Sequence, residues 1–379
     1  MSVEKRIVFL TGTRADYGKI KSLLRVLNED KNYKVDVIVT GMHLLSKYGG
    51  TAAEVLRDEL GVIHLLPNQH AEQSMEISLA RTIEQISEFL NRNSVDLLVV
   101  HGDRIEALAG AIVGALKNVP VGHIEGGEVS GTVDGLIRHS VSKLAHLHFV
   151  SNQSAQNRLV QLGEESESIH IIGSPDVDVM FSSNLPTLSD VQKRYEINYE
   201  KYGIVTFHPV TNEHHFIASQ AQEICRALVE SGENFVVIKP NNDLGSDIIQ
   251  EIFEKELTSN NFKHLPSMRF EHFLTLMKHA DYMIGNSSAG VRETSYYGVP
   301  SINIGTRQLN RNSNNIILNV GYSQTEILQS IEDVKKLPRN PIYSYGKGDS
   351  DSIFKEILDK KIEWPIKTHK VFVDMEKTQ

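Results

Sequence analysis

Short apolar runs alternate with longer amphipathic segments along most of the chain. In the first half the runs, with their flanking residues, read RIVFLTG, KVDVIVTG, VIHLL, VDLLVVHGD, VPVGHIEGG and LHFVS. In the second half they read YGIVTFHP, NFVVIKPNND, DYMIGNSS and VPSINIG. Segments with helical spacing separate them, such as KIKSLLRVLNED, SMEISLARTIEQISEFLNR and RIEALAGAIVGALK. This alternation predicts βαβ units, with mainly parallel sheets covered by helices on both faces.

The chain of 379 residues is too long for one ordinary open-sheet domain and long enough for two. We place the break in the polar, proline-containing stretch from Ser182 to Gly203, because YGIVTFHPVT then resembles a new first strand and loop. The fold class expected is α/β, with two Rossmann-like domains facing a cleft. The first domain covers residues 1–182 and about 355–379, since the helical segment DSIFKEILDKKIEW is expected to return to it. The second domain covers residues 183–354.

Composition and charge narrow the class of ligand. The net charge of −9 argues against nucleic acids and anionic membranes as partners, but an anionic small ligand needs only local arginines and backbone N–H groups. No apolar run approaches the roughly 20 residues of a membrane span, and the N-terminal run IVFL is too short for a signal sequence. The single cysteine, Cys225, cannot form an internal disulfide and is expected to be a buried thiol. We expect a cytoplasmic protein.

Ionisable residues follow the strands predicted in the first half, at the edge where open α/β sheets bind ligands. In FLTGTRADYGK, Arg14 and Asp16 begin a helix after a turn containing glycine, which is a natural site for a diphosphate. The alternative is an ordinary turn with a solvated arginine. In LVVHGDRIEAL, Asp103 and Arg104 follow a nearly all-apolar strand. Asp103 is either the N-cap of the next helix or a catalytic group.

The stretch HIEGGEVSGTVDGLIRHS is rich in acids and bases. Glu125 lies at the carboxyl end of a predicted strand, and the two glycines after it permit close approach of a ligand. If a helix begins near Thr132 or Asp134, then Asp134 and Arg138 share one of its faces. A salt-bridged surface helix is the alternative. The histidines suggest a metal, but no paired metal-ligand spacing occurs here, so no metal is predicted.

The second half carries two comparable motifs. In VTFHPVTNEHH, His208 ends a strand, where it is either structural or catalytic. In MIGNSSAGVRETSYYGVPSINIGTRQLNR, small residues join a strand to a helix and leave hydroxyls and helix N–H groups for a pyrophosphate, unless this is an ordinary tight connection. Glu293 follows, where a carboxylate can accept both hydroxyls of a ribose. The candidate substrate contacts of this half are Asn241, Ser287, Ser288, Gly290, Glu293 and Arg307.

At these motifs the sequence resembles the hydrolysing UDP-N-acetylglucosamine 2-epimerases of bacterial sialic acid and capsule pathways. The resemblance covers nearly the whole chain, with GTRADYGK, VTGMH, HGDRIEALAG, HIEGGEVSGTVDGLIRHS, IHIIGSPD, FHPVT, NSSAGVRE and YGVPSINIGTRQ in the expected order. It implies a GT-B-like fold, UDP held mainly by the second domain, a homodimer, and no metal or other cofactor. It also implies the reaction of UDP-N-acetylglucosamine with water to give N-acetylmannosamine and UDP.

The same resemblance assigns roles to particular residues. The implied catalytic set is Asp103, Glu125, Asp134, Arg138 and His208. The implied nucleotide contacts are Arg14, Arg104, Ser287, Ser288 and Glu293. The non-hydrolysing branch typically reads H-V-E-A-G-L-R-T and later P-E-E-x-N-R, whereas this chain has Asp134 and R-H-S there, which favours hydrolysis. One departure is Lys239, which stands where relatives tend to have an apolar or aromatic residue.

The implied reaction explains a need for several acids and bases. The sugar C2 proton is not acidic, because no carbonyl group lies next to it. A carboxylate base can remove it if UDP leaves at the same time and the growing negative charge is stabilised. Elimination then gives 2-acetamidoglucal, and water adds with the opposite C2 configuration. The alternatives are a hydrolysing 2-epimerase of a UDP-2,4-diacetamido sugar, a GT-B glycosyltransferase and a non-catalytic nucleotide-sugar sensor.

Overall fold

The computed structural model describes residues 4–46, 49–68, 74–129, 133–240, 243–308 and 315–374. The chain divides into two compact units. Unit 1 comprises Met1–Glu128, Asp134–Ser182 and Ser344–Gln379, and unit 2 comprises Val129–Val133 and Ser183–Tyr343. The expected α/β class with two Rossmann-like parallel sheets is confirmed. The chain re-enters unit 1 at Ser344, whereas residue 355 was expected.

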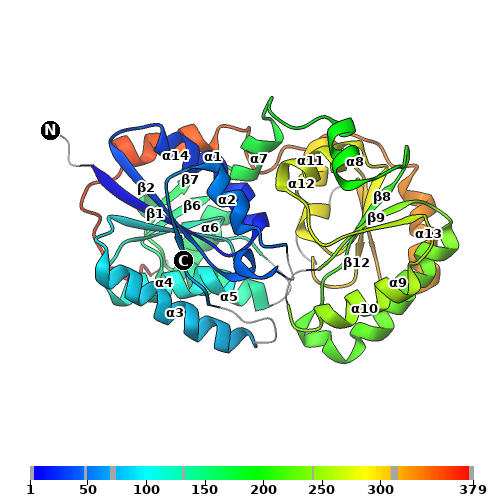
Figure 1. The fold of residues 1–379 in the computed structure, drawn as a ribbon. Helices are drawn as coiled ribbons and strands as arrows, with labels where there is room; N and C mark the ends of the chain where they lie inside the picture. Colours follow the sequence, from blue (N-terminus) through cyan, green and yellow to red (C-terminus); the bar gives the residue numbers. More distant parts are fainter. Residues whose placement is uncertain are drawn as a thin grey trace, which may run out of the picture. The chain divides into compact units, whose positions relative to one another are not determined.

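Unit 1 contains a parallel sheet of seven strands in the order β3-β2-β1-β4-β5-β6-β7. The strands are β1 (Lys5–Thr11), β2 (Tyr33–Val39), β3 (Val62–Leu65), β4 (Leu97–His101), β5 (Val121–Ile124), β6 (Leu147–Val150) and β7 (Ile169–Ile171). The helices are α1 (Arg14–Asn28), α2 (Ala52–Asp58), α3 (Met75–Arg92), α4 (Ile105–Leu116), α5 (Val133–Leu144), α6 (Gln153–Gln161), α7 (Pro175–Met180) and α14 (Ser350–Lys360). Helices α3 and α4 cover one face of this sheet, and α1 and α14 cover the other (Figure 1). Strands covered on both faces require nearly continuous apolar runs, which explains the sequence pattern.

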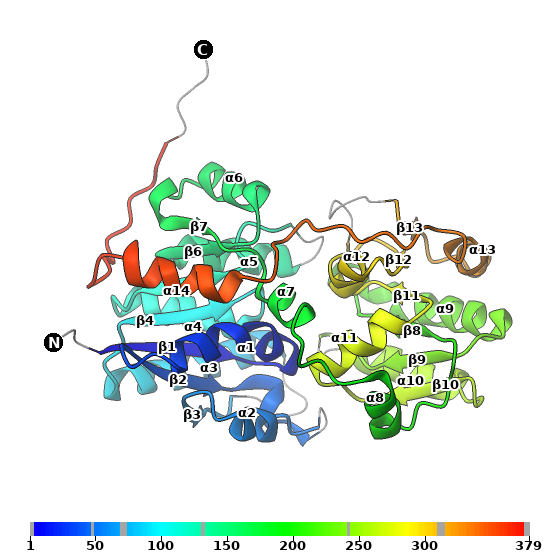
Figure 2. The same cartoon turned by 90° about the horizontal axis from the view of Figure 1, so that it is seen from above.

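Helix α14, which corresponds to the predicted C-terminal helix, packs in unit 1 beside α1, so that segments from both ends of the chain lie side by side (Figure 2). Phe354 of this helix is fully buried. Its ring lies 6.4 Å from that of Phe9 in β1 and 4.7 Å from that of Phe149 in β6. Burying one such side chain stabilises the fold by roughly 1.5–3 kcal/mol, so α14 is part of the core of unit 1.

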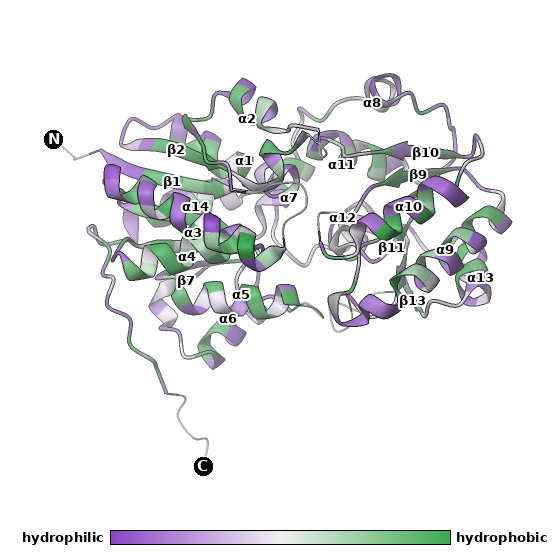
Figure 3. Ribbon diagram, turned by 60° about the horizontal axis from the view of Figure 1, so that its bottom comes forward, coloured by the Kyte–Doolittle hydropathy of each residue, from purple (hydrophilic) through white to green (hydrophobic). Residues whose placement is uncertain are grey.

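Unit 2 contains a parallel sheet of six strands in the order β10-β9-β8-β11-β12-β13. The strands are β8 (Gly203–Thr206), β9 (Phe235–Ile238), β10 (Phe262–Leu265), β11 (Tyr282–Gly285), β12 (Ser301–Ile304) and β13 (Ile317–Val320). The helices are α8 (Leu188–Tyr195), α9 (Ile217–Ser231), α10 (Ser246–Glu256), α11 (Phe270–His279), α12 (Glu293–Tyr297) and α13 (Gln324–Val334). Residues of α9, α10 and α13 form one apolar cluster with the sheet, and residues of α8 and α11 form another. Figure 3 shows these helices with green and purple faces, as amphipathic helices on a sheet require.

Three edge strands were absent from the predicted set, namely β7 of unit 1 and β10 and β13 of unit 2. Strand β10 reads FKHL, with Lys263 and His264 at its centre, and β13 reads ILNV, with the exposed Asn319. An edge strand is hydrogen-bonded on one side only and tolerates such polar residues. The apolar pattern therefore identified the central strands of the unit 2 sheet and missed its edges.

Each sheet has one point where the strand order reverses direction. In unit 1 this point lies between β1 and β4, and in unit 2 it lies between β8 and β11. Ligands of open α/β sheets bind beyond the carboxyl ends of the strands at such points. The loops after these four strands carry most of the predicted site residues.

Candidate functional site

The turn after β1 is organised by the side chain of Asp16. Thr13 is the N-cap of α1, and its hydroxyl accepts a hydrogen bond from the Asp16 N–H at 3.2 Å. The Asp16 carboxylate accepts hydrogen bonds from the N–H groups of Gly12 and Thr13, both at 3.0 Å. This reciprocal capping box fixes the start of α1. The structure shows that the Asp16 carboxylate holds the turn, and its contact with substrate stays a prediction.

Glu106 of α4 fills the space beneath the turns after β1 and β2. A side chain added at Gly12 or Gly41 would place its Cβ 2.8 Å or 2.6 Å from atoms of the buried Glu106. The two glycines are therefore needed for close approach. Arg14 lies in the same turn, and its Nε is 2.9 Å from a carboxylate oxygen of Glu54. The alternative of a solvated Arg14 is therefore wrong.

Helix α5 brings a buried cation to the ends of β4 and β5. It begins at Val133, as predicted. Arg138 is only 4% exposed, so the alternative of a salt-bridged surface helix is wrong. Its Nη1 donates to the backbone oxygen of Glu125 at 2.6 Å, and its Nη2 pairs with the carboxylate of Asp103. One guanidinium therefore orients residues from two neighbouring strands.

Asp103 lies one residue before the N-cap of α4 and pairs with a cation. The N-cap of α4 is Arg104, whose side chain makes no capping hydrogen bond but has its Nε 4.0 Å from Glu106. Asp103 instead pairs with Arg138 and keeps 23% of its side chain exposed. A carboxylate beside a guanidinium is favoured in its ionised form, which a general base requires. Asp134 lies in the first turn of α5.

Glu125 has an unusual backbone and a buried carboxylate. Its φ of +62° lies in the left-handed region, which residues other than glycine rarely adopt. Its carboxylate accepts a hydrogen bond from the Ser174 hydroxyl and lies 3.3 Å from Nε2 of His101. Its side chain is 2% exposed. Strained backbone in a sharp turn after a strand is a feature of functional sites.

His123 stabilises the same loops from within the core. Its Nδ1 lies 2.9 Å from the Ser142 hydroxyl and its Nε2 lies 2.8 Å from the Gly102 oxygen. A carbonyl oxygen only accepts, so Nε2 carries the proton and Nδ1 accepts from Ser142. Burial lowers the pKa of His123 to about 3, so the ring is neutral at physiological pH. His123 is a structural residue and not a metal ligand.

In unit 2, Asn286 fixes the loop that carries His208. The Asn286 side chain accepts a hydrogen bond from the His208 N–H at 2.7 Å and donates one to the His208 oxygen at 2.8 Å. Asn286 is fully buried and follows β11, while His208 follows β8. This paired contact joins the two loops at the reversal point of the sheet. Arg307 Nη1 donates to the Asn286 oxygen at 3.2 Å and so lies at the same loop.

We expect Asn286→Ala to lower the free energy of unfolding of unit 2 by roughly 2–6 kcal/mol, because it leaves a buried donor and a buried acceptor of His208 without these bonds. Turnover should fall with it, since His208 loses its fixed position. Urea unfolding followed by circular dichroism measures the first effect. The control is Asn340→Ala after α13, where the side chain is exposed, and this change should alter stability by no more than about 0.5 kcal/mol. Equal effects of the two variants on stability would contradict the role of Asn286 in fixing the loop of His208.

The loop after β11 has the small residues of an anion site. A pocket at the end of the sheet is lined by Thr206, Met283, Gly285, Ser287, Gly290, Ile302 and Asn303. Gly285 has φ +135°, and a Cβ there would lie 2.0 Å from the Thr206 oxygen. Ser288 begins a short 3-10 turn, and Glu293 is buried at the start of α12. Four of the predicted residues of unit 2 therefore lie in one segment after β11, and His208 and Arg307 contact this segment through Asn286. Asn241 lies outside the described residues.

Sequence reasoning missed several residues that orient the site. Ser174 holds the Glu125 carboxylate, His101 lies beside it, and Asn286 holds His208. His101 is the last residue of β4 and stands two positions before Asp103. Its position at the end of a strand could have identified it from the sequence. Ser174 comes from a distant loop before α7, and only the fold reveals its contact.

The two sets of residues differ in chemistry. Unit 1 gathers two oriented carboxylates and a buried guanidinium, which suits proton transfer. Unit 2 offers small residues and hydroxyls in the segment after β11, of the kind that can bind an anion. Among the described residues, no group of three or more His, Cys, Asp or Glu side chains has the arrangement of a metal site. In the same part of the chain no helix is long and apolar enough to cross a membrane.

A family model and individual related sequences both identify the same family. Residues 25–359 match the family model described as UDP-N-acetylglucosamine 2-epimerase. The UDP-N-acetylglucosamine 2-epimerase of Neisseria meningitidis serogroup B is 46% identical over 376 residues, which are 98% of this chain and 99% of that protein. The UDP-N,N'-diacetylbacillosamine 2-epimerase (hydrolyzing) of Legionella pneumophila is 30% identical over 359 residues, which are 93% of this chain and 95% of that one.

The fold also matches a solved structure. A crystal structure of UDP-GlcNAc 2-epimerase from Neisseria meningitidis bound to UDP-GlcNAc aligns with a TM-score of 0.79 at 19% identity, over 94% of this chain and 100% of that one. At this identity the likeness establishes the fold. It agrees with the GT-B-like architecture expected from the sequence.

Proposed function

We propose, on the premise that the chain belongs to the UDP-N-acetylglucosamine 2-epimerase family, that it is the hydrolysing kind of this enzyme. It would convert UDP-N-acetylglucosamine and water into N-acetylmannosamine and UDP. The observation that carries the proposal is the bridge that Arg138 makes between Asp103 and Glu125. The bridge joins the Asp103 carboxylate to the backbone oxygen of Glu125, and Ser174 holds the Glu125 carboxylate. Two carboxylates are thus fixed at neighbouring strand ends, and an elimination followed by a hydration needs separate acid and base groups.

The proposal divides the work between the predicted residues. Asp103, Glu125 and Asp134 supply the carboxylates that move protons at the sugar, and Arg138 keeps Asp103 in its ionised form. His208 neutralises charge on the departing diphosphate. The proposed nucleotide contacts are Arg14, Asp16, Arg104, Asn241, Ser287, Ser288, Gly290, Glu293 and Arg307.

The hydrolysing outcome is supported by the sequence around α5 and by a relative. Asp134 and the R-H-S sequence differ from the pattern of the non-hydrolysing branch. The Legionella pneumophila relative is described as hydrolyzing, and it acts on a diacetylated sugar nucleotide. A UDP-2,4-diacetamido sugar is therefore the second candidate substrate. The greater identity to the Neisseria meningitidis enzyme favours UDP-N-acetylglucosamine. The N-acetylmannosamine formed would supply sialic acid synthesis.

The first experiment is incubation with UDP-N-acetylglucosamine in D₂O, followed by proton NMR. We expect free N-acetylmannosamine with deuterium at C2, together with UDP. Formation of UDP-N-acetylmannosamine instead would show a non-hydrolysing enzyme. Turnover of the diacetamido sugar alone would select the second substrate, and UDP release only with an added acceptor would indicate a transferase. The proposed homodimer is checked separately by sedimentation equilibrium.

A further inference from the structure

The chain beyond α14 forms an extended segment that is bound along unit 1. We name residues 365–374 the C-terminal strap. The oxygen of Thr368 lies 3.2 Å from Nε2 of His146, and the N–H of Val373 donates to the oxygen of Gly163 at 3.1 Å. The strap is therefore held on both sides of its middle residue, Lys370.

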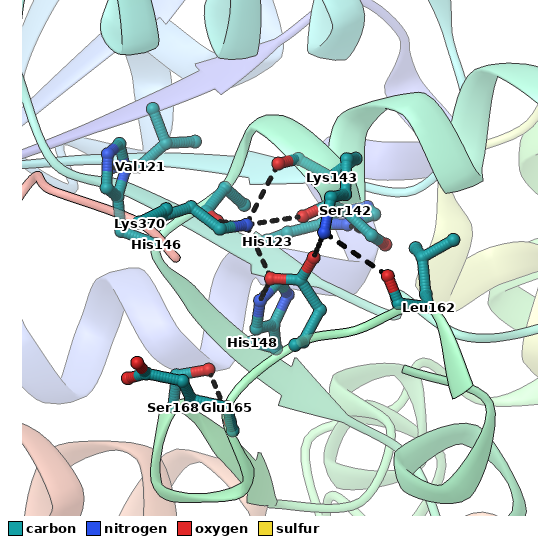
Figure 4. Close-up of polar contacts among 12 residues, drawn as sticks. Val121, His123, Ser142, Lys143, His146, His148, Leu162, Glu165, Ser168 and Lys370 are labelled. Atoms are coloured by element: carbon teal, nitrogen blue, oxygen red, sulfur yellow. Dashed lines mark hydrogen bonds and ion pairs between the residues drawn. The ribbon is translucent and has the colours of Figure 1, made fainter. Parts of the chain in front are cut away.

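Lys370 places its ammonium group at the C-terminal end of α5 (Figure 4). It donates to the backbone oxygens of Ala145 at 2.6 Å, Lys143 at 2.9 Å and Ser142 at 3.5 Å. It also lies 2.5 Å from a carboxylate oxygen of the buried Glu164. The last carbonyl groups of a helix have no partner within the helix and carry partial negative charge, so a cation there is favourable. Lys370 thus caps α5 with a side chain that lies 225 positions from Ala145.

The position of α5 determines the geometry of the proposed catalytic groups. Arg138 and Ser142 are four residues apart and so lie on one face of the helix. Arg138 pairs with Asp103, and Ser142 bonds His123, whose other nitrogen bonds the oxygen of Gly102 directly before Asp103. A shift or rotation of α5 would therefore displace Arg138, which pairs with Asp103. It would also displace Ser142 and with it His123, which bonds the residue before Asp103.

We propose that Lys370 is a positioning residue for the reaction, which acts by holding α5 and thereby the contact between Arg138 and Asp103. This inference rests on the proposed function for its effect on turnover. Its structural part stands on the contacts of Lys370 alone. The contacts of Lys370 are with the end of α5 and with Glu164, none of which is a proposed nucleotide contact, so its loss should lower kcat and leave KM nearly unchanged.

The test compares Lys370→Met with Lys367→Met. Lys367 lies in the same strap, is exposed, and makes no hydrogen bond or ion pair within the described ranges. For Lys370→Met we expect kcat to fall roughly 10- to 100-fold per folded molecule, because displacement of a reacting group by about 1 Å has effects of this size. Lys367→Met should retain the wild-type kcat. Circular dichroism establishes that each variant is folded at the assay temperature.

The kcat of Lys370→Arg and hydrogen exchange in α5 test the role of Lys370 in two further ways. Lys370→Arg keeps the charge but cannot seat a compact ammonium on three carbonyls, so its kcat should lie between those of wild type and Lys370→Met. Hydrogen exchange of the amides in residues 137–144 requires no substrate and should accelerate in Lys370→Met but not in Lys367→Met.

The results separate a positioning role of Lys370 from a merely structural one. A lower stability of Lys370→Met with unchanged kcat and unchanged exchange in α5 would show that Lys370 is merely structural and would overturn the inference. If the wild-type protein does not turn over UDP-N-acetylglucosamine, the proposed function fails. Exchange in α5 then decides whether Lys370 holds this helix.

Discussion

Glu125→Gln is expected to lower turnover of UDP-N-acetylglucosamine by roughly 100- to 10,000-fold, the range attributed to loss of a general acid or base. The substitution keeps the shape of the side chain and removes its ability to take up a proton. Glu125 follows β5 with a left-handed backbone, and its carboxylate is fixed by Ser174 and lies near His101. These features fix the orientation of the Glu125 carboxylate, as a general acid or base requires.

The matched control is Glu128→Gln, three residues further along the same loop. Glu128 is also buried, and its carboxylate accepts a hydrogen bond from Ser151 at 2.7 Å. We expect this variant to keep turnover close to that of the wild-type protein. The assay follows UDP release and deuterium at C2 separately, so it also shows which step depends on Glu125. Equal losses in both variants, or full turnover by Glu125→Gln, would contradict a catalytic role.

Acid should destabilise unit 1 well before most carboxylates are protonated. Burial lowers the pKa of His123 to about 3 and that of His170 to about 4, and it also lowers the pKa values of His146 and His148. In the unfolded chain these rings titrate near the ordinary value of 6.5. Between the two pKa values the unfolded state binds a proton that the folded state excludes. Stability is therefore full above pH 6.5 and is lost as the pH falls toward the folded pKa values.

The expected loss is about 1.4 kcal/mol per pH unit for each such histidine, which for His123 amounts to roughly 5 kcal/mol by pH 3. A loss of this size is comparable with the total stability of a typical domain. The single tryptophan, Trp364, packs against the core of unit 1, so its fluorescence reports unfolding of that unit. Urea unfolding at pH 7, 6 and 5 should give steadily lower free energies.

A control separates buried from exposed histidines. His215→Gln replaces an exposed ring in unit 2 and should leave the pH dependence unchanged. His123→Gln should lower stability at pH 7, because it disturbs the bonds to Ser142 and Gly102. It should also reduce the dependence of the free energy of unfolding on pH by the contribution of about one proton. A free energy of unfolding that is constant from pH 7 to pH 5 would rule out this account.

The sequence by itself determined the alternation of strands and helices, and with it the α/β class. Buried parallel strands need nearly continuous apolar runs, and amphipathic helices need a polar face, so both leave a local record. The positions of Glu125 and His208 directly after strands were readable for the same reason. Edge strands such as β10 left a weaker record, because one side of an edge is open and accepts polar residues.

The tertiary structure alone decided which side chains meet. Asp134 and Arg138 are four residues apart on α5, and the fold adds contacts of Arg138 with Asp103 and Glu125 on two other elements. Ser174 and Lys370 reach their partners across large distances in the sequence, and no local period encodes such contacts. Periodicity records which face of an element is buried, because burial depends on the element's own repeat. The identity of the partner depends on how the elements pack, and that is a property of the whole fold.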